Sequence, residues 1–124
     1  MRMKTLAAAV GVALLTILPV GPAVAQSLAG NYLGSGGSTM SISEIADGRY
    51  RVKMEIGAPR CGGAVDATGR MRGDSLVASP SGSGAACTLT IRRRGAALSV
   101  SENNCMSFHG ASCEFEGIYQ RRSR

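Results

Sequence analysis

The sequence is poor in the side chains that catalytic and nucleic-acid-binding sites usually require. Aromatic residues make up 4% of its 124 residues, tryptophan is absent, and there is a single histidine, His109. Any acid–base mechanism that uses histidine would therefore depend on His109 alone. Base stacking needs aromatic side chains beside basic ones, and most of the few aromatics fall at positions expected to face inward. We expect no nucleic-acid partner, although basic residues cluster at 92–94 and at 121–124.

Long apolar runs are also scarce, and the one that exists lies at residues 6–20. It follows two basic residues and precedes a Gly-Pro pair and the small-x-small triplet Ala23-Val24-Ala25, an order typical of a secretory signal peptide. A membrane anchor is the alternative, but a spanning helix needs roughly 20 apolar residues. We expect residues 1–25 to be a cleaved signal peptide and 26–124 to form a single periplasmic or secreted β-domain without a transmembrane segment.

The cysteine spacing argues against a metal site. No cysteine precedes Cys61, and the closest pair, Cys105 and Cys113, is too widely spaced to resemble the C-x-x-C pairs of structural zinc. Four cysteines in a short exported chain predict two disulfides. We favour Cys61–Cys87 and Cys105–Cys113, because each bond joins neighbours along the chain, although the two other pairings remain open. We expect no metal and no cofactor.

Strict alternation of apolar and polar residues is the strongest local pattern. In residues 49–56 every even position is apolar and every odd position is charged, which predicts a half-buried strand with Tyr50, Val52, Met54 and Ile56 facing inward. The pair Asp47-Gly48 predicts a tight hairpin turn before it. Further strands are expected at 29–34, 38–45, 63–70, 74–79, 87–92, 96–100 and 113–120. In the strand at 96–100 the inward residues are expected to be Ala96, Leu98 and Val100. In the strand at 113–120 they are expected to be Cys113, Phe115, Gly117 and Tyr119.

These strands predict an all-β fold with no helix after the signal-peptide helix. About eight short antiparallel strands fit either an up-and-down barrel or a small β-sandwich. The tripeptide Gly30-Asn31-Tyr32 near the start is echoed by Gly117-Ile118-Tyr119 near the end. Because glycine within a strand permits the sharp coiling that closure requires, we favour the barrel.

Two surfaces carry candidate binding residues. The loop from Cys105 to Cys113 contains Ser107, His109 and Ser112, and the strand at 49–56 places Arg49, Arg51 and Lys53 on one side. The formal charge of +6 falls to about +4 when the two basic residues of the signal peptide are removed, which favours attraction to an anionic envelope component. A solvated, non-binding strand exterior is the alternative for the basic residues.

An enzyme is the less favoured interpretation of the same loop. A catalytic triad would need a nucleophile and an acid around His109, and Glu114 and Glu116 could supply a carboxylate pair. The sequence contains no nucleophile-elbow motif, and we favour a structural histidine that hydrogen-bonds the loop backbone. A ligand carrier is a further alternative, but a barrel of this length with bulky inward residues would have a filled interior.

The cysteine, glycine and tyrosine pattern resembles a group of small bacterial periplasmic β-domains found as the C-terminal parts of lysozyme-inhibitor-like exported proteins. The resemblance rests on Cys61-Gly62, on Cys-x-Leu-x-Ile at 87–91 and on Phe-x-Gly-x-Tyr at 115–119. It implies a non-enzymatic binding domain whose loop 105–113 plugs the cleft of a hydrolase. The Ser-Gly-x-x-Tyr motif of c-type lysozyme inhibitors is absent, and a positive domain would repel basic lysozymes.

Overall fold

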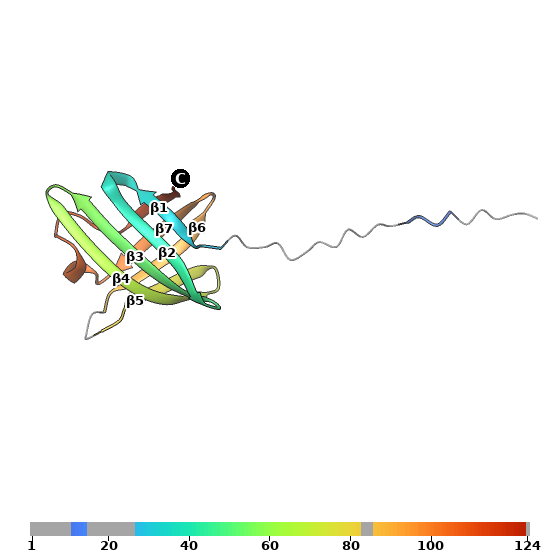
Figure 1. Cartoon of the computed structure of the whole chain (residues 1–124), viewed down its shortest axis with the longest axis horizontal. Coiled ribbons are helices and arrows are strands. Elements are labelled where there is room, and N and C mark those ends of the chain that lie inside the picture. The colour runs from blue at the N-terminus through green and yellow to red at the C-terminus, as the bar shows by residue number, and fades with distance from the viewer. Residues whose placement is uncertain (1–10, 15–26, 83–85, 124) are drawn as a thin grey trace, which may run out of the picture.

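The structure is a computed structural model that describes residues 11–14, 27–82 and 86–123, and it forms a barrel (Figure 1). The expected signal peptide lies outside the described residues except for 11–14, which have no regular secondary structure. Two single-turn 3-10 helices, η1 (Ser35–Gly37) and η2 (Met106–Phe108), accompany eight strands. The strands are β1 (Gly30–Gly34), β2 (Ser38–Ala46), β3 (Arg49–Ala58), β4 (Cys61–Arg72), β5 (Ser75–Pro80), β6 (Thr88–Arg94), β7 (Ala97–Asn103) and β8 (Gly117–Arg121).

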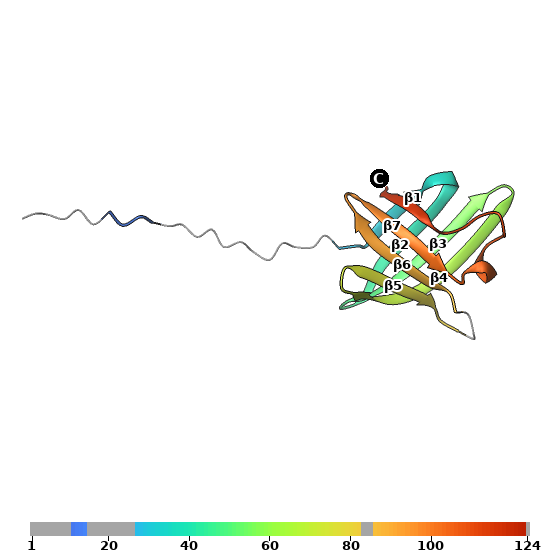
Figure 2. The ribbon, with the colours of Figure 1, turned by 180° about the vertical axis from the view of Figure 1, so that it is seen from behind.

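Each strand pairs antiparallel with its neighbours in sequence, and β8 pairs with β1 to close the barrel. The expected up-and-down barrel of eight strands is thus confirmed, and the sandwich is not found. In Figure 2 the strands that lie behind in Figure 1 come forward, and they show the same diagonal course. Closure through the pairing of Leu33 with Gln120 joins the two segments that carry the Gly-x-Tyr echo.

The barrel interior is filled by the alternating apolar side chains. Val52, Met54 and Ile56 of β3 are buried as predicted, while Tyr50 near the end of the barrel is half-buried. The inward positions of β6 and β7 follow the same rule, because Leu89, Ile91, Leu98 and Val100 are all buried.

Two predictions about strand ends are wrong. Ala96 is exposed in the β6–β7 turn and the buried alanine is Ala97, because the two-residue turn at Gly95 shifts the start of β7. Residues 113–116 are not part of a strand, and β8 begins at Gly117. Phe115 is nevertheless fully buried. Its backbone N–H donates to the Glu102 carboxylate (2.8 Å) and not to a neighbouring strand, so this buried position does not need a strand partner.

The predicted disulfide pairing is also wrong: the structure joins Cys61 to Cys113 and Cys87 to Cys105. The β6–β7 register explains the second bond, because Thr88 lies opposite Asn103 and so brings the residues flanking this pair together. The first bond forms because the segment after β7 crosses the barrel end to reach the start of β4. Proximity along the chain was a poor guide, since an antiparallel sheet places residues distant in sequence side by side.

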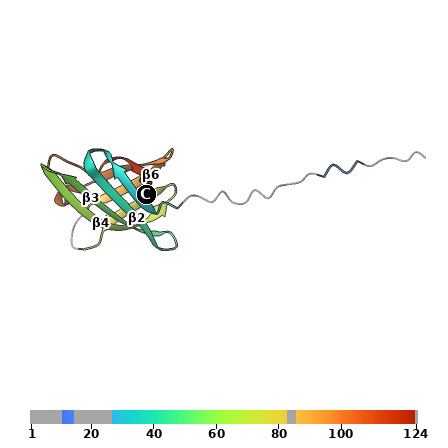
Figure 3. The same ribbon diagram turned by 45° about the horizontal axis from the view of Figure 1, so that its top comes forward.

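The two ends of the barrel differ in their connections. The arginine end holds the turns 47–48, 73–74 and 95–96 and the ends of β1 and β8 that lead to the termini; Figures 1 and 3 show these turns on the side where the chain enters the barrel. The disulfide end holds η1, the β3–β4 turn and residues 104–116 with both disulfides.

The Gly-x-Tyr echo is part of a longer repeat that closes both barrel ends. In each copy a buried apolar residue, Leu28 or Phe115, precedes the glycine by two positions. The tyrosine that follows the glycine by two positions donates its hydroxyl to the carbonyl oxygen of this apolar residue, at a distance of 2.7 Å in both copies. Because β1 and β8 run in opposite directions, Leu28 covers the arginine end and Phe115 covers the disulfide end. The repeat therefore closes the barrel at its top and bottom as well as around its side.

Gly34 provides a test of this packing. A Cβ at Gly34 would lie 2.7 Å from Cε1 of the buried Tyr119 ring, so Gly34→Val is expected to lower the free energy of unfolding by about 2 kcal/mol through overpacking. Urea denaturation measures the change. Gly57→Val is the matched control, because no atom lies within 4 Å of a Cβ there; equal losses in both variants would contradict the proposed role of Gly34.

Candidate functional site

Residues 104–116, called the rim loop below, form the longest connection at the disulfide end. The chain leaves β7 through Asn104, whose φ of 59° turns it sharply, and then forms η2. At its middle the Gly110 N–H donates to the Gly62 carbonyl (3.1 Å), and His109 pairs with Gly63 as an isolated bridge. The rim loop thus crosses from β7 to the start of β4 and returns to β8.

The two disulfides fix the rim loop near its two ends. Cys105 bonds to Cys87 before β6, and Cys113 bonds to Cys61 at the start of β4. A Cβ at Gly110 would lie 2.7 Å from the Cys61 sulfur, so the loop backbone packs directly on this bond. A loop held by two covalent bonds loses little conformational entropy on binding a partner.

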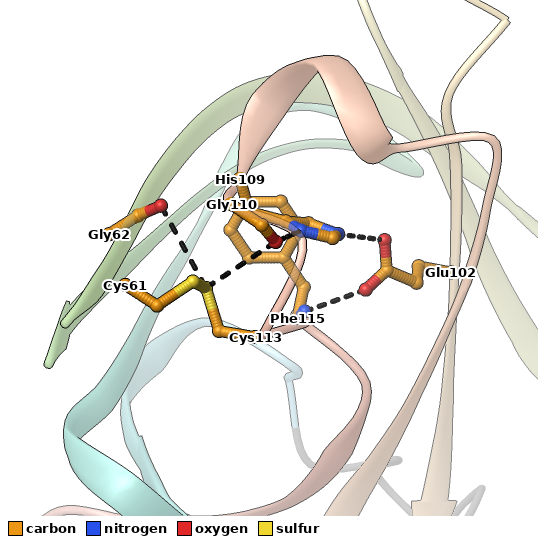
Figure 4. The surroundings of a disulfide bond; sticks show 7 residues. All are labelled: Cys61, Gly62, Glu102, His109, Gly110, Cys113 and Phe115. Carbon is orange, nitrogen blue, oxygen red and sulfur yellow. Dashed lines mark hydrogen bonds and ion pairs between the residues drawn. A yellow bond between two sulfur atoms is a disulfide. The ribbon is translucent and has the colours of Figure 1, made fainter.

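The His109 imidazole lies beneath the rim loop in a buried network (Figure 4). Nε2 lies 2.8 Å from Oε2 of Glu102, and Nδ1 lies 2.7 Å from the Gly110 carbonyl oxygen. The second oxygen of Glu102 accepts the Phe115 N–H, and the Phe115 ring meets the imidazole edge to face at 5.2 Å. The Glu102 carboxylate therefore bonds to both halves of the rim loop, through His109 and through Phe115.

Both ring nitrogens of His109 face oxygen acceptors, an arrangement that suits the doubly protonated imidazolium. Burial by itself would lower the pKa of His109. The hydrogen bonds to Gly110 and Glu102, together with the charges of Glu102 and Glu114, outweigh burial and raise this pKa above its ordinary value of 6.5. The pair is a closed ion pair, with 3% of the His109 side chain and 11% of the Glu102 side chain exposed.

The structure separates the three predicted residues of this loop. Ser107 and Ser112 are exposed, whereas the His109 side chain is buried with both nitrogens bonded within the chain. Sequence reasoning missed Met106, which is 62% exposed beside Ser107. The rim loop thus exposes one large apolar side chain and two hydroxyls.

A hollow of about 230 Å³ lies beside the rim loop. Glu114 and Glu116, considered above as a carboxylate pair, both line it, together with Ser38 and the buried Tyr119. Burial raises the pKa of the Tyr119 hydroxyl above its ordinary value and outweighs the opposing effect of the Ser38 hydrogen bond, and the nearby charge of Glu102 adds a smaller increase. The hollow is acidic and is suited to a cationic or hydrogen-bond-donating group of a partner.

The predicted basic residues of β3 lie on the barrel exterior, but they are not equivalent. Arg51 donates to Asp66 on β4 (Nε to Oδ1, 2.9 Å), and this hydrogen bond lowers the pKa of Asp66. Lys53 lies directly opposite Asp66 and lines a shallow depression of about 550 Å³ over β1–β3. Arg49 lies opposite Arg70 instead, so the positive charge increases toward the arginine end.

Sequence reasoning missed how many arginines meet at the arginine end. In an up-and-down barrel alternate turns share one end, so basic residues beside alternate turns come together. The signal was present in the sequence, since each of the three glycine-containing turns there has an arginine next to it. The end carries Arg49, Arg70, Arg72, Arg92, Arg93, Arg94, Arg121 and Arg122 against the carboxylates Glu44, Asp47 and Asp74.

The C-terminal basic residues also have a structural role that the sequence did not reveal. The Arg121 guanidinium donates to the carbonyls of Ser27 and Ala29, each at a distance of 3.1 Å. It also lies 5.3 Å from the centre of the Tyr32 ring. It therefore holds the segment that places Leu28 over the arginine end.

Within the described ranges 11–14, 27–82 and 86–123 no group of three or more His, Cys, Asp or Glu side chains is placed to hold a metal ion. Within the same ranges no helix has the length and apolar character needed to span a membrane.

The fold and the site define a small, closed, antiparallel β-barrel with a disulfide-fixed rim loop at one end and an arginine-rich rim at the other. Comparison with known proteins finds no matching family model, no similar curated protein and no similar solved structure. The likeness to lysozyme-inhibitor-like modules thus rests on the sequence motifs and stays a prediction.

Proposed function

We propose that this protein is an exported, non-enzymatic binding domain that inserts its rim loop into the cleft of a basic hydrolase and inhibits it. The observation that carries this proposal is the fixation of the rim loop by two disulfides and by the buried Glu102–His109 pair. A rigid, projecting loop with exposed Met106, Ser107 and Ser112 is a suitable insert for a cleft, because its conformation is set before binding.

The charge distribution removes the main objection to a basic partner. The domain as a whole is positive, but three of its exposed carboxylates, Glu55, Glu114 and Glu116, lie toward the disulfide end, where Arg60 is a neighbouring cation. A basic hydrolase that approaches this end meets opposite charge, while most of the arginines lie at the far end. Such complementarity orients the encounter and increases the association rate.

The structure of the loop favours binding over catalysis at this site. A general base needs a nitrogen or oxygen that can reach the substrate proton, whereas the His109 nitrogens are bonded to Glu102 and Gly110 beneath the loop. The filled barrel interior likewise supports recognition by surface side chains over storage of a small ligand.

Inhibition of a purified basic c-type lysozyme acting on peptidoglycan tests the proposal. The wild-type protein is expected to inhibit near stoichiometrically. Ala111→Arg, which adds bulk and positive charge to an exposed position of the rim loop, is expected to weaken inhibition at least about thirtyfold. Ala96→Arg is the matched control, because Ala96 is an exposed turn alanine at the arginine end.

Two outcomes would contradict the proposal. Absence of inhibition by the wild-type protein would overturn the proposed inhibition, and equal losses in the two variants would show that the rim loop is not the contact. Unfolding curves of both variants verify that the barrel is intact.

A further inference from the structure

The arginine end has features that the rim-loop proposal does not use. Besides its arginines it exposes two large apolar side chains, Ile45 at 49% and Met71 at 37%. Ile45 lies at a register shift just before the β2–β3 turn, and Met71 lies just before the β4–β5 turn. Both side chains lie at the opposite end of the barrel from the rim loop.

The β3–β4 register places these two turns side by side. Arg49 begins β3 and lies directly opposite Arg70 near the end of β4, so Ile45 and Met71 are next to a like-charged cross-strand pair. Like charges placed directly opposite are unfavourable in an isolated sheet. Arg72, the last residue of β4, adds a third exposed guanidinium at the same place.

We propose that the arginine end docks on an anionic phospholipid membrane, with Arg49, Arg70 and Arg72 contacting headgroup phosphates and Ile45 and Met71 inserting between the headgroups. Arginine binds phosphate with bidentate geometry, which accounts for the cations. Ile45 and Met71, called the apolar tips below, are exposed beside two adjacent turns and are suited to the headgroup–acyl boundary. A soluble polyanion would use the arginines and leave the apolar tips without a partner, so the membrane explains more of the surface.

The orientation that follows is compatible with a second partner. With the arginine end on the membrane, the rim loop at the opposite end faces away from it. The two proposals use different residues and are tested separately, so failure of one leaves the other standing.

Vesicle cosedimentation tests the membrane proposal, using protein that begins at Gln26 so that the apolar N-terminal stretch does not contribute. The barrel strands begin at Gly30, after this start. We expect binding to vesicles that contain phosphatidylglycerol and none to pure phosphatidylcholine, with affinity falling as salt screens the charges. Arg70→Glu with Arg72→Glu is expected to weaken binding at least about thirtyfold.

Matched controls separate this surface from general charge. Arg60→Glu makes at the disulfide end the same charge change that Arg70→Glu alone makes at the arginine end, and it is expected to leave vesicle binding almost unchanged. Arg70→Glu keeps the fold, because it creates an opposite-charge pair with Arg49. Thermal unfolding of each variant checks this expectation.

The apolar tips distinguish a membrane from a soluble polyanion. Ile45→Ser with Met71→Ser is expected to reduce binding to phosphatidylglycerol vesicles several-fold and to leave binding to polyphosphate unchanged. If the variant with Ile45→Ser and Met71→Ser instead bound vesicles with the full wild-type affinity, the membrane proposal would be overturned and the arginine end would be identified as a polyanion site. Equal loss in the Arg60→Glu control would overturn it as non-specific attraction.

Discussion

Removal of the Cys61–Cys113 disulfide by a double change to alanine is expected to lower the free energy of unfolding by about 4 kcal/mol. This bond closes a loop with a sequence separation of 52 residues, and in the chain-entropy model the stabilisation grows with the length of the closed loop. The total stability of a domain is typically about 5–15 kcal/mol, so the variant would be close to unfolding. Urea denaturation under non-reducing conditions measures the loss.

The Cys87–Cys105 bond is the internal comparison. Its sequence separation of 18 residues predicts a smaller loss, about 3 kcal/mol, for the corresponding double alanine variant. The two loops are nested, so the losses in a fourfold variant should not add fully. Mass spectrometry of a non-reduced digest should yield a peptide that links Cys61 to Cys113, and a Cys61–Cys87 peptide would contradict the structure.

Breaking the buried Glu102–His109 pair is the second change with a large expected effect. Glu102→Gln removes the charge that balances the imidazolium, and loss of one member of a buried pair costs about 3–5 kcal/mol. The variant keeps an oxygen acceptor for the Phe115 N–H, so the effect isolates the ion pair. Arg51→Gln, which breaks an exposed pair, is the control and should change stability little.

The same pair predicts a pH dependence. Because the folded state raises the pKa of His109 above 6.5, the folded protein binds its proton more tightly than the unfolded chain does. The stabilisation is therefore complete below pH 6.5 and is lost as the pH rises through the raised value. Unfolding curves recorded across this range should show the loss in the wild-type protein and a flatter profile in Glu102→Gln. Identical profiles would contradict the assignment.

Much of the barrel could be predicted because its strands are half-buried. Alternation at residues 49–56 determines which side chains face inward, and the turn at Asp47-Gly48 determines where the chain reverses. Both are local properties, so the sequence pattern reports them directly. The segment 113–116 also alternates, but here burial of Phe115 arises from the end of the barrel and not from a strand, and alternation does not distinguish the two.

The site depends on contacts between residues that are distant along the chain, and these were harder to predict. The Cys61–Cys113 bond and the Glu102–His109 pair both require the path of the rim loop across the barrel end. His109 was considered as a binding residue from its place in a loop, whereas its burial follows from a carboxylate on β7. The arginine end follows from connectivity alone once an up-and-down barrel is accepted.

Pairing of β1 with β8 also restricts how a partner can recognise this protein. Every strand already has a hydrogen-bonded neighbour on each side along at least part of its length, so the barrel offers no complete edge strand for β-augmentation by an incoming peptide. Recognition must instead come from side chains on the outer wall or at the two rims. A partner will consequently select this molecule by its loop chemistry and its arginines, which can vary while the wall of the barrel stays the same.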